Sequence, residues 1–211
     1  MVKTAVLVSG GGTNLQAIIN SLNFGKIKNC ELAAVISSKP NVFALTRAKN
    51  AGIPTYVVDY AGYPDRDAFN EAIYQKLKSL EIELVVMAGF LVVLGEPLVS
   101  AYENRIINIH PSLVPAFCGE GLYGIRVHQA VLDYGVKISG ATVHFATGKA
   151  DAGPVIMQRA IFIREDETPQ SLQMRIMQEV EWKILPEAIS LFCEGRLSVV
   201  GRIVHIKESI E

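Results

Sequence analysis

The first half of this sequence alternates short apolar segments with segments of helical periodicity, and this alternation restricts the fold more than any other feature. We expect strands at five apolar segments, residues 4–9, 31–38, 54–58, 83–88 and 104–110. We expect helices between them, at residues 13–22, 43–51 and 65–80. Uninterrupted apolar strands separated by helices are typical of a parallel sheet covered on both faces. The pattern therefore predicts an α/β fold: a doubly wound, Rossmann-like, mostly parallel sheet.

The second half changes character, and we interpret it as a C-terminal elaboration of strands and helices within one domain. Two longer, partly alternating strands are expected at residues 136–146 and 155–163. A long helix should begin near Thr168, a hydroxyl cap that is followed by proline in the first turn. Pro186 should kink or restart that helix, and a final strand is expected at residues 198–206.

The charge balance argues against a broad surface for nucleic acid or for an anionic membrane. Lys and Arg number 20 against 21 Asp and Glu, and no run of like charges stands out. The longest apolar run, residues 84–94, is well short of the roughly 20 residues that a membrane-spanning helix needs. The three cysteines, Cys30, Cys118 and Cys193, are widely spaced without a CxxC pair. We therefore expect a cytoplasmic protein with neither disulfides nor a metal site.

A glycine-rich loop, SGGGTN at residues 9–14, joins the first strand to the first helix. A dinucleotide fingerprint would need a third glycine where Leu15 stands, and an acid after the second strand, which ends in Ser-Ser-Lys. A Walker A loop would need a lysine, so neither NAD nor a nucleoside triphosphate is expected. The start of a helix at Gly12, Thr13 and Asn14 suits one phosphate group. The alternative is a tight β–α turn without a ligand.

The stretch NIHPS places two polar side chains at the end of a predicted strand. Asn108 and His110 are two residues apart and so share one face of the strand, and Pro111 ends it. They lie at the carboxyl edge, where doubly wound folds bind ligands. An amide that can bind an oxyanion beside an imidazole that can transfer a proton suits acyl transfer. The alternative is a polar pair satisfied by neighbouring backbone.

Two further residues could join this pair. Asp151 precedes an Ala-Gly-Pro turn, where a carboxylate usually serves the turn itself. If it folds back onto His110, we expect it to raise the imidazole pKa and favour the proton-donating form. His144 lies on the preceding strand, and we interpret it as a structural partner rather than a catalyst.

The ordered set of motifs resembles the folate-dependent phosphoribosylglycinamide formyltransferases. The matching segments cover nearly the whole chain: SGGGTNLQAI, MAGFLVVL, NIHPSLVP, GATVHF and DAGP. The resemblance implies transfer of a formyl group from the co-substrate 10-formyltetrahydrofolate to the amine of glycinamide ribonucleotide, without a metal or NAD. It implies two halves within one domain of residues 1–211: a phosphate-binding half at 1–103, and a catalytic and folate-binding half at 104–211.

The same resemblance implies roles for individual residues. Asn108, His110 and Asp151 match the catalytic trio, with Pro111 and His144 in support. Residues matching the ribonucleotide site are Gly12, Thr13 and Asn14 for the phosphate, and Gln178 and Glu181, three apart on one helix face, for the sugar side. Residues matching the folate site are Arg66, Leu91, Val92, Val93, Leu94 and Asn108.

The chain also departs from the common family pattern. The loop after Pro115 is several residues longer and richer in glycine, so its contacts cannot be carried over. Val92 stands where a basic residue is often found, and Ala152 where a glycine is usual. The alignment of Gln178 and Glu181 crosses a one-residue gap.

Other functions remain open at this stage. Formyltetrahydrofolate deformylases and methionyl-tRNA formyltransferases share the catalytic core, but they usually carry a further domain that we do not expect here. The sequence of the glycine loop does not support a nicotinamide-dependent dehydrogenase. A non-catalytic module that binds a phosphorylated metabolite would need no Asn-His-Asp trio. The pattern is compatible with either a monomer or a homodimer.

Overall fold

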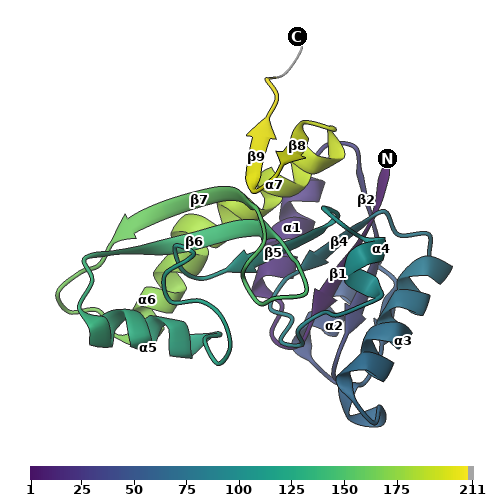
Figure 1. Cartoon of the computed structure of the whole chain (residues 1–211), viewed down its shortest axis with the longest axis horizontal. Helices are drawn as coiled ribbons and strands as arrows, with labels where there is room; N and C mark the ends of the chain where they lie inside the picture. Colours follow the sequence, from purple (N-terminus) through teal and green to yellow (C-terminus); the bar gives the residue numbers. More distant parts are fainter. Residues whose placement is uncertain (209–211) are drawn as a thin grey trace.

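The computed structural model describes residues 1–208, which form a nine-stranded sheet in the order β3-β2-β1-β4-β5-β6-β7-β9-β8 (Figure 1). The parallel part consists of β1 Val2–Val8, β2 Cys30–Ser37, β3 Thr55–Val57, β4 Leu84–Met87 and β5 Ile106–His110. The remaining strands are β6 Ile138–Phe145, β7 Val155–Phe162, β8 Leu197–Val200 and β9 Ile203–Ile206. Strand β6 pairs antiparallel with β5 and β7. The predicted doubly wound, mostly parallel sheet is confirmed.

Helices cover both faces of the sheet, as the apolar strands require. They are α1 Thr13–Asn23, α2 Phe43–Asn50, α3 Arg66–Ser79, α4 Leu98–Ala101, α5 Ile125–Tyr134, α6 Pro169–Ile176 and α7 Trp182–Cys193. Strand β1 alternates between the two cores: Val6 and Val8 pack with residues of α1, α2 and α7, whereas Ala5 and Leu7 pack with α3 and α4. Helix α3 presents Phe69, Ile73 and Leu77, all fully buried at four-residue spacing, to the second core.

The order of the strands reverses between β1 and β4, the point at whose carboxyl ends doubly wound folds bind ligands. The loops that follow the two strands are tied together there. The Ser9 backbone N–H donates to the Gly89 carbonyl at 3.1 Å, and the Leu91 N–H donates to Ser9 Oγ at 3.1 Å. The glycine loop and the segment after β4 therefore form one edge of the molecule.

Two expectations for the C-terminal part are corrected. Helix α7 continues through Pro186, and the irregular turn is a π-helical segment, Met177–Glu181, that precedes it. A proline crowds the carbonyl four residues earlier, and a wide turn ahead of that carbonyl accommodates the ring. The predicted strand at 198–206 is instead a hairpin, β8–β9, because Gly201 turns the chain at a φ of 59°.

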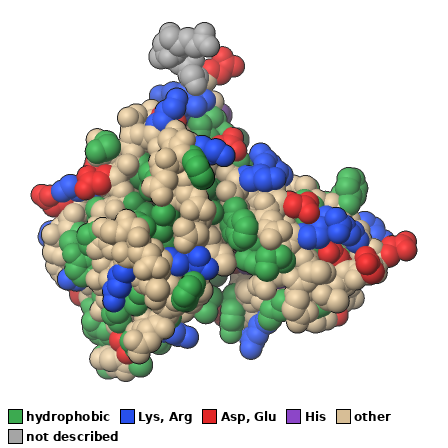
Figure 2. Space-filling model, turned by 180° about the vertical axis from the view of Figure 1, so that it is seen from behind, with side chains coloured by type: hydrophobic (Ala, Val, Ile, Leu, Met, Phe, Trp, Pro, Cys, Tyr) green, Lys and Arg blue, Asp and Glu red, His purple; other side chains and the backbone are tan. Residues whose placement is uncertain are grey.

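No helix within residues 1–208 is long and apolar enough to cross a membrane. Acidic and basic side chains lie interspersed over the face shown in Figure 2, which agrees with the balanced charge of the sequence. The last three residues of the predicted second half, 209–211, lie outside the described residues.

Candidate active site

The antiparallel pairing of β5 and β6 places Asn108 directly opposite His144. Asn108 Nδ2 lies 3.0 Å from His144 Nε2, and His144 Nδ1 lies 2.9 Å from the Phe145 carbonyl oxygen. Because a carbonyl oxygen only accepts, a hydrogen of His144 belongs on Nδ1, and Nε2 faces both the Asn108 amide and the Asp151 carboxylate. His144 therefore orients the side chain of Asn108.

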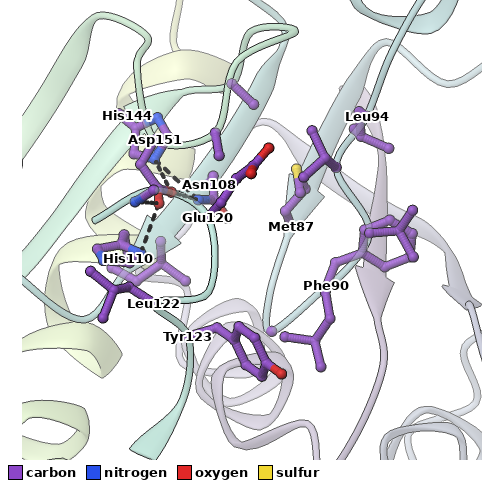
Figure 3. A pocket seen from close by; sticks show the side chains of 18 of the residues that line it. Met87, Phe90, Leu94, Asn108, His110, Glu120, Leu122, Tyr123, His144 and Asp151 are labelled. Carbon is purple, nitrogen blue, oxygen red and sulfur yellow. Dashed lines mark hydrogen bonds and ion pairs between the residues drawn. The ribbon is translucent and has the colours of Figure 1, made fainter. Parts of the chain in front are cut away.

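Asp151 completes the cluster from the loop between β6 and β7 (Figure 3). Its Oδ2 lies 3.4 Å from His110 Nδ1 and accepts the Gly119 backbone N–H at 3.0 Å. Its Oδ1 lies 3.4 Å from Asn108 Nδ2 and 3.5 Å from His144 Nε2. The structure thus brings Asn108, His110 and Asp151 together, with the first two on one strand face as their spacing predicts.

Burial decides the charge of the His110 imidazole. It lowers the pKa of His110, and the opposing charge of Asp151 and a bond to the Phe117 carbonyl do not restore it. Asp151 does fold back and raises the pKa, as expected, but desolvation is the larger effect, so the expectation that the proton-donating form is favoured was wrong. Burial alone would raise the pKa of Asp151, but His144, His110 and the Gly119 N–H together lower it. The resting site holds a charged carboxylate beside a neutral imidazole.

Both nitrogens of His110 face hydrogen-bond acceptors. Nδ1 faces Asp151, and Nε2 lies 3.0 Å from the Phe117 carbonyl oxygen. A neutral ring can donate to only one of the two, whereas a ring that has gained a proton donates to both. The surroundings therefore suit an imidazole that receives a proton transiently.

The trio forms one side of a cavity of about 350 Å³. The opposite wall is apolar and consists of Met87, Phe90, Leu91, Val92, Val93 and Leu94. The four predicted residues 91–94 are thus part of this wall. Arg66, the first residue of α3, is not among the lining residues. Its Nε lies 3.8 Å from Asp67 Oδ1. Among residues 1–208, no group of three or more His, Cys, Asp or Glu side chains is placed to hold a metal ion.

Part of the lining was missed by the sequence reasoning. Residues 119–124 of the long loop form a third wall, with Glu120, Leu122 and Tyr123 labelled in Figure 3. The position of this loop in the sequence could have indicated its role. A loop that follows the strand bearing Asn108 and His110 must leave from the ligand-binding edge of the sheet. Lys149 and Ala150, beside Asp151, also line the cavity.

The glycine loop has the geometry that its sequence predicts. Gly12 precedes α1 with a φ of 71°, and a Cβ there would lie 2.6 Å from Ala44 Cβ, so only glycine fits. No side chain of the described residues caps this helix start. Its first backbone N–H groups and the positive end of the helix dipole at Thr13 and Asn14 therefore favour an anion.

Asn14 also joins the two predicted parts of the ribonucleotide site. Its Nδ2 donates to Glu181 Oε2 at 2.7 Å, whereas its buried Oδ1 has no partner among the described residues. Burial raises the pKa of Glu181 to about 7, and only the Asn14 bond opposes it. A protonated Glu181 would supply the donor that Asn14 Oδ1 lacks. Gln178 is exposed whereas Glu181 is buried, because the segment winds as a π-helix and does not keep them on one face.

The Glu181 proton should make stability depend on pH. The folded chain holds it up to about pH 7, whereas unfolded glutamate releases it near pH ~4.3. Stability therefore falls as the pH rises between these values, by about 4 kcal/mol in total. Glu181→Gln removes the titrating group and keeps an oxygen that can accept the Asn14 hydrogen bond, so urea unfolding should show a flatter profile and a variant more stable than the parent at pH 8. The exposed Glu165→Gln variant should keep the parent slope, and an unchanged slope in Glu181→Gln would contradict this assignment.

The chain matches the family described as formyl transferase over residues 2–189. It is 40% identical over 198 residues to the trifunctional purine biosynthetic protein adenosine-3 of Gallus gallus, covering 94% of this chain and 19% of that protein. It is 37% identical over 194 residues to phosphoribosylglycinamide formyltransferase of Escherichia coli strain K12, covering 92% of this chain and 88% of that protein. The chain thus spans about a fifth of the length of its trifunctional relatives.

The fold agrees with these matches. The crystal structure of glycinamide ribonucleotide transformylase 1 from Symbiobacterium toebii superposes with a TM-score of 0.92 at 43% identity, covering 99% of this chain and 95% of that chain. The matches in sequence and in structure show that the chain belongs to the formyl transferase family, among the phosphoribosylglycinamide formyltransferases.

Proposed function

We propose that this chain transfers the formyl group of 10-formyltetrahydrofolate to the amine of glycinamide ribonucleotide, a reaction of purine biosynthesis. The observation that carries the proposal is the meeting of two binding features at the switch point of the sheet. A helix start suited to a phosphate follows β1, and an apolar cavity with the Asn-His-Asp cluster lies at the ends of β4 and β5. Relatives of matching length carry the name of this activity.

The acceptor would bind along the edge that joins these two features. Its phosphate would accept hydrogen bonds from the N–H groups of Gly12, Thr13 and Asn14 at the start of α1. Glu181, held beside Asn14, would face the sugar, and the exposed Gln178 would contact it from the rim. The link between Ser9 and Leu91 holds this edge against the cavity wall.

The donor would fill the cavity. The apolar wall at Leu91, Val92, Val93 and Leu94 would flank its flat heterocycle, with Asn108 at the reacting end. Arg66 would act outside the cavity, on the charged tail of the donor. Asn70 supports this placement, since its Nδ2 lies within hydrogen-bond distance of the carbonyls of both Arg66 and Val93, at 3.0 and 3.5 Å.

The chemistry needs no covalent enzyme intermediate, because the acceptor amine is itself the nucleophile. Attack on the formyl carbon creates an oxyanion. Asn108 Nδ2 can donate to this oxyanion by giving up the longer of its two contacts, the one to Asp151. The amine proton passes to His110, directly or through a water held by Asp151, and then to the departing folate nitrogen. Pro111 ends β5 and so fixes the backbone of His110. Juxtaposing two bound reactants can itself remove roughly 7–11 kcal/mol of the barrier.

All of the proposed site residues come from one chain, so a monomer or a homodimer would hold a complete site. The half at residues 1–103 supplies the phosphate loop and one cavity wall, and the half that starts at residue 104 supplies the trio and the other walls. We place the reaction in the cytoplasm, where Cys30, Cys118 and Cys193, all free, would stay reduced.

An absorbance assay of 10-formyl folate consumption, with and without glycinamide ribonucleotide, tests the proposal. We expect turnover only when the ribonucleotide is present, with formylglycinamide ribonucleotide as the product. Turnover without the ribonucleotide would identify a hydrolase of the deformylase type. Intact ribonucleotide binding by calorimetry without any turnover would identify a non-catalytic binding module.

A further inference from the structure

Two successive carbonyl groups of the glycine loop point toward α2. The Gly10 carbonyl oxygen accepts the Ala44 backbone N–H at the start of α2, at 3.1 Å. The Gly11 carbonyl oxygen accepts from Arg47 Nε, one turn further along the same helix, at 2.9 Å. Helix α2 therefore holds the acceptor groups of this loop.

The bond from Arg47 also fixes the direction of a backbone donor. The peptide bond between Gly11 and Gly12 is trans, so its N–H lies opposite its carbonyl group. Because Arg47 holds the Gly11 carbonyl, the Gly12 N–H points to the other side of the loop, where it has no acceptor among residues 1–208. This N–H is the first of the three donors proposed for the acceptor's phosphate. Arg47 and the phosphate would thus bind the two ends of one peptide group.

Without Arg47, this peptide group would be free to turn over. A Cβ at Gly11 would meet no heavy atom of the described chain within 4 Å, so packing does not hold the residue. Turning the peptide changes ψ of Gly11 and φ of Gly12, and glycine tolerates both signs of these angles. A turned peptide would present a carbonyl oxygen to the phosphate in place of an N–H. The apparent affinity then falls with the fraction of molecules that keep the binding orientation.

Two further contacts hold the Arg47 side chain. Its Nη1 donates to Gln16 Oε1 at 3.1 Å, and its guanidinium carbon lies 4.7 Å from the centroid of the Phe43 ring. A planar guanidinium can stack on a ring and bind two acceptors at once, whereas a lysine ammonium does not reproduce this arrangement. The position therefore uses the shape of arginine in addition to its charge.

We propose that Arg47 is a positioning residue for the acceptor, which holds the glycine loop in the orientation that binds the phosphate by way of the Gly11 carbonyl. This inference rests on the proposed function. Nε and Nη1 of Arg47 are engaged by Gly11 and Gln16, so the residue acts through the loop. Arg47 does not line the donor cavity, so donor binding and the chemical step should not depend on it.

Arg47→Lys tests this assignment, because it keeps the positive charge and removes the planar guanidinium. The KM and the calorimetric Kd for glycinamide ribonucleotide should rise about 10- to 100-fold, as expected when a charge-assisted hydrogen bond is lost. The kcat at saturating ribonucleotide and the KM for the formyl donor should stay within about three-fold of the parent. Lys49→Gln is the matched control, since it removes a charge from an exposed position of the same helix, and it should match the parent.

Gln16→Ala provides a second variant that leaves the Gly11 bond in place. It should raise the ribonucleotide KM less than Arg47→Lys does. Because both residues act through one guanidinium, the double variant should exceed Arg47→Lys alone by less than about two-fold. Rises that multiply in the double variant would contradict a shared action on the loop.

The outcomes separate the inference from the function on which it rests. A parent-like ribonucleotide KM in Arg47→Lys, or an equal rise in Lys49→Gln, would show that charge near the loop is enough and would overturn the role of Arg47. A fall in kcat together with a rise in the donor KM would also overturn it, by indicating a general structural role. A parent enzyme without ribonucleotide-dependent turnover would overturn the proposed function itself.

Discussion

Replacing His110 by alanine or Asp151 by asparagine should lower kcat about 10²–10⁴-fold while the affinity for glycinamide ribonucleotide stays close to that of the parent. His110 is the group placed to take the amine proton, since its two ring nitrogens face the Asp151 carboxylate and the Phe117 carbonyl, both hydrogen-bond acceptors. Asp151→Asn keeps the size of the side chain but removes the charge that stabilises the protonated imidazole. The proposed phosphate contacts at the start of α1 are untouched by either change.

Steady-state rates and calorimetric titration with the ribonucleotide measure the two quantities separately. His205→Ala and Asp166→Asn are matched controls, since both residues are exposed and lie outside the cavity lining. Both controls should retain the parent rate. Parent-like turnover in His110→Ala or in Asp151→Asn would remove that residue from the mechanism. A joint loss of rate and of ribonucleotide binding would instead indicate a structural role.

The positions that sequence reasoning placed well are those controlled by local rules. The strand ending at His110 follows from its apolar run and from Pro111, and the period of two then puts Asn108 on the same face. Gly12 was placed by the glycine-rich loop before a helix, and its φ of 71° and the close approach of Ala44 explain why a glycine stands there. The motifs also indicated Asp151, but the contact itself depends on a loop that returns across 40 residues and was confirmed only in three dimensions.

The features that the sequence did not reveal depend on long-range burial and on loop geometry. The lowered pKa of His110 results from desolvation by the completed cavity, which no local pattern records. The wall formed by Glu120 and Tyr123 belongs to a glycine-rich loop without periodicity. Gln178 and Glu181 were assigned to one face on α-helical spacing, but a π-helical turn separates them, and only Glu181 faces inward to bond Asn14.

Replacing Gly153 by alanine should lower both stability and turnover, although Gly153 is not placed in contact with either substrate. A Cβ at this position would overlap the Phe145 carbonyl oxygen and lie 3.2 Å from Thr147 Cγ2. Phe145 cannot yield easily, because its N–H donates to the Pro154 carbonyl at 2.9 Å and its own carbonyl oxygen holds His144 Nδ1. The loop that carries Asp151 must therefore move away from β6. Overpacking of this kind destabilises proteins by roughly 1–3 kcal/mol.

The same displacement should reduce kcat by about 10²-fold, because a shift of roughly 1 Å in a reacting group has an effect of that size. Gly148→Ala provides the control, since it lies in the same loop and a Cβ there meets no heavy atom within 4 Å. Urea unfolding and steady-state rates should show both losses in Gly153→Ala and neither in Gly148→Ala. A stable, fully active Gly153→Ala variant would mean that the loop reaches the catalytic geometry without this close approach. Equal losses in the two variants would mean that the loop needs glycine for flexibility rather than for contact with β6.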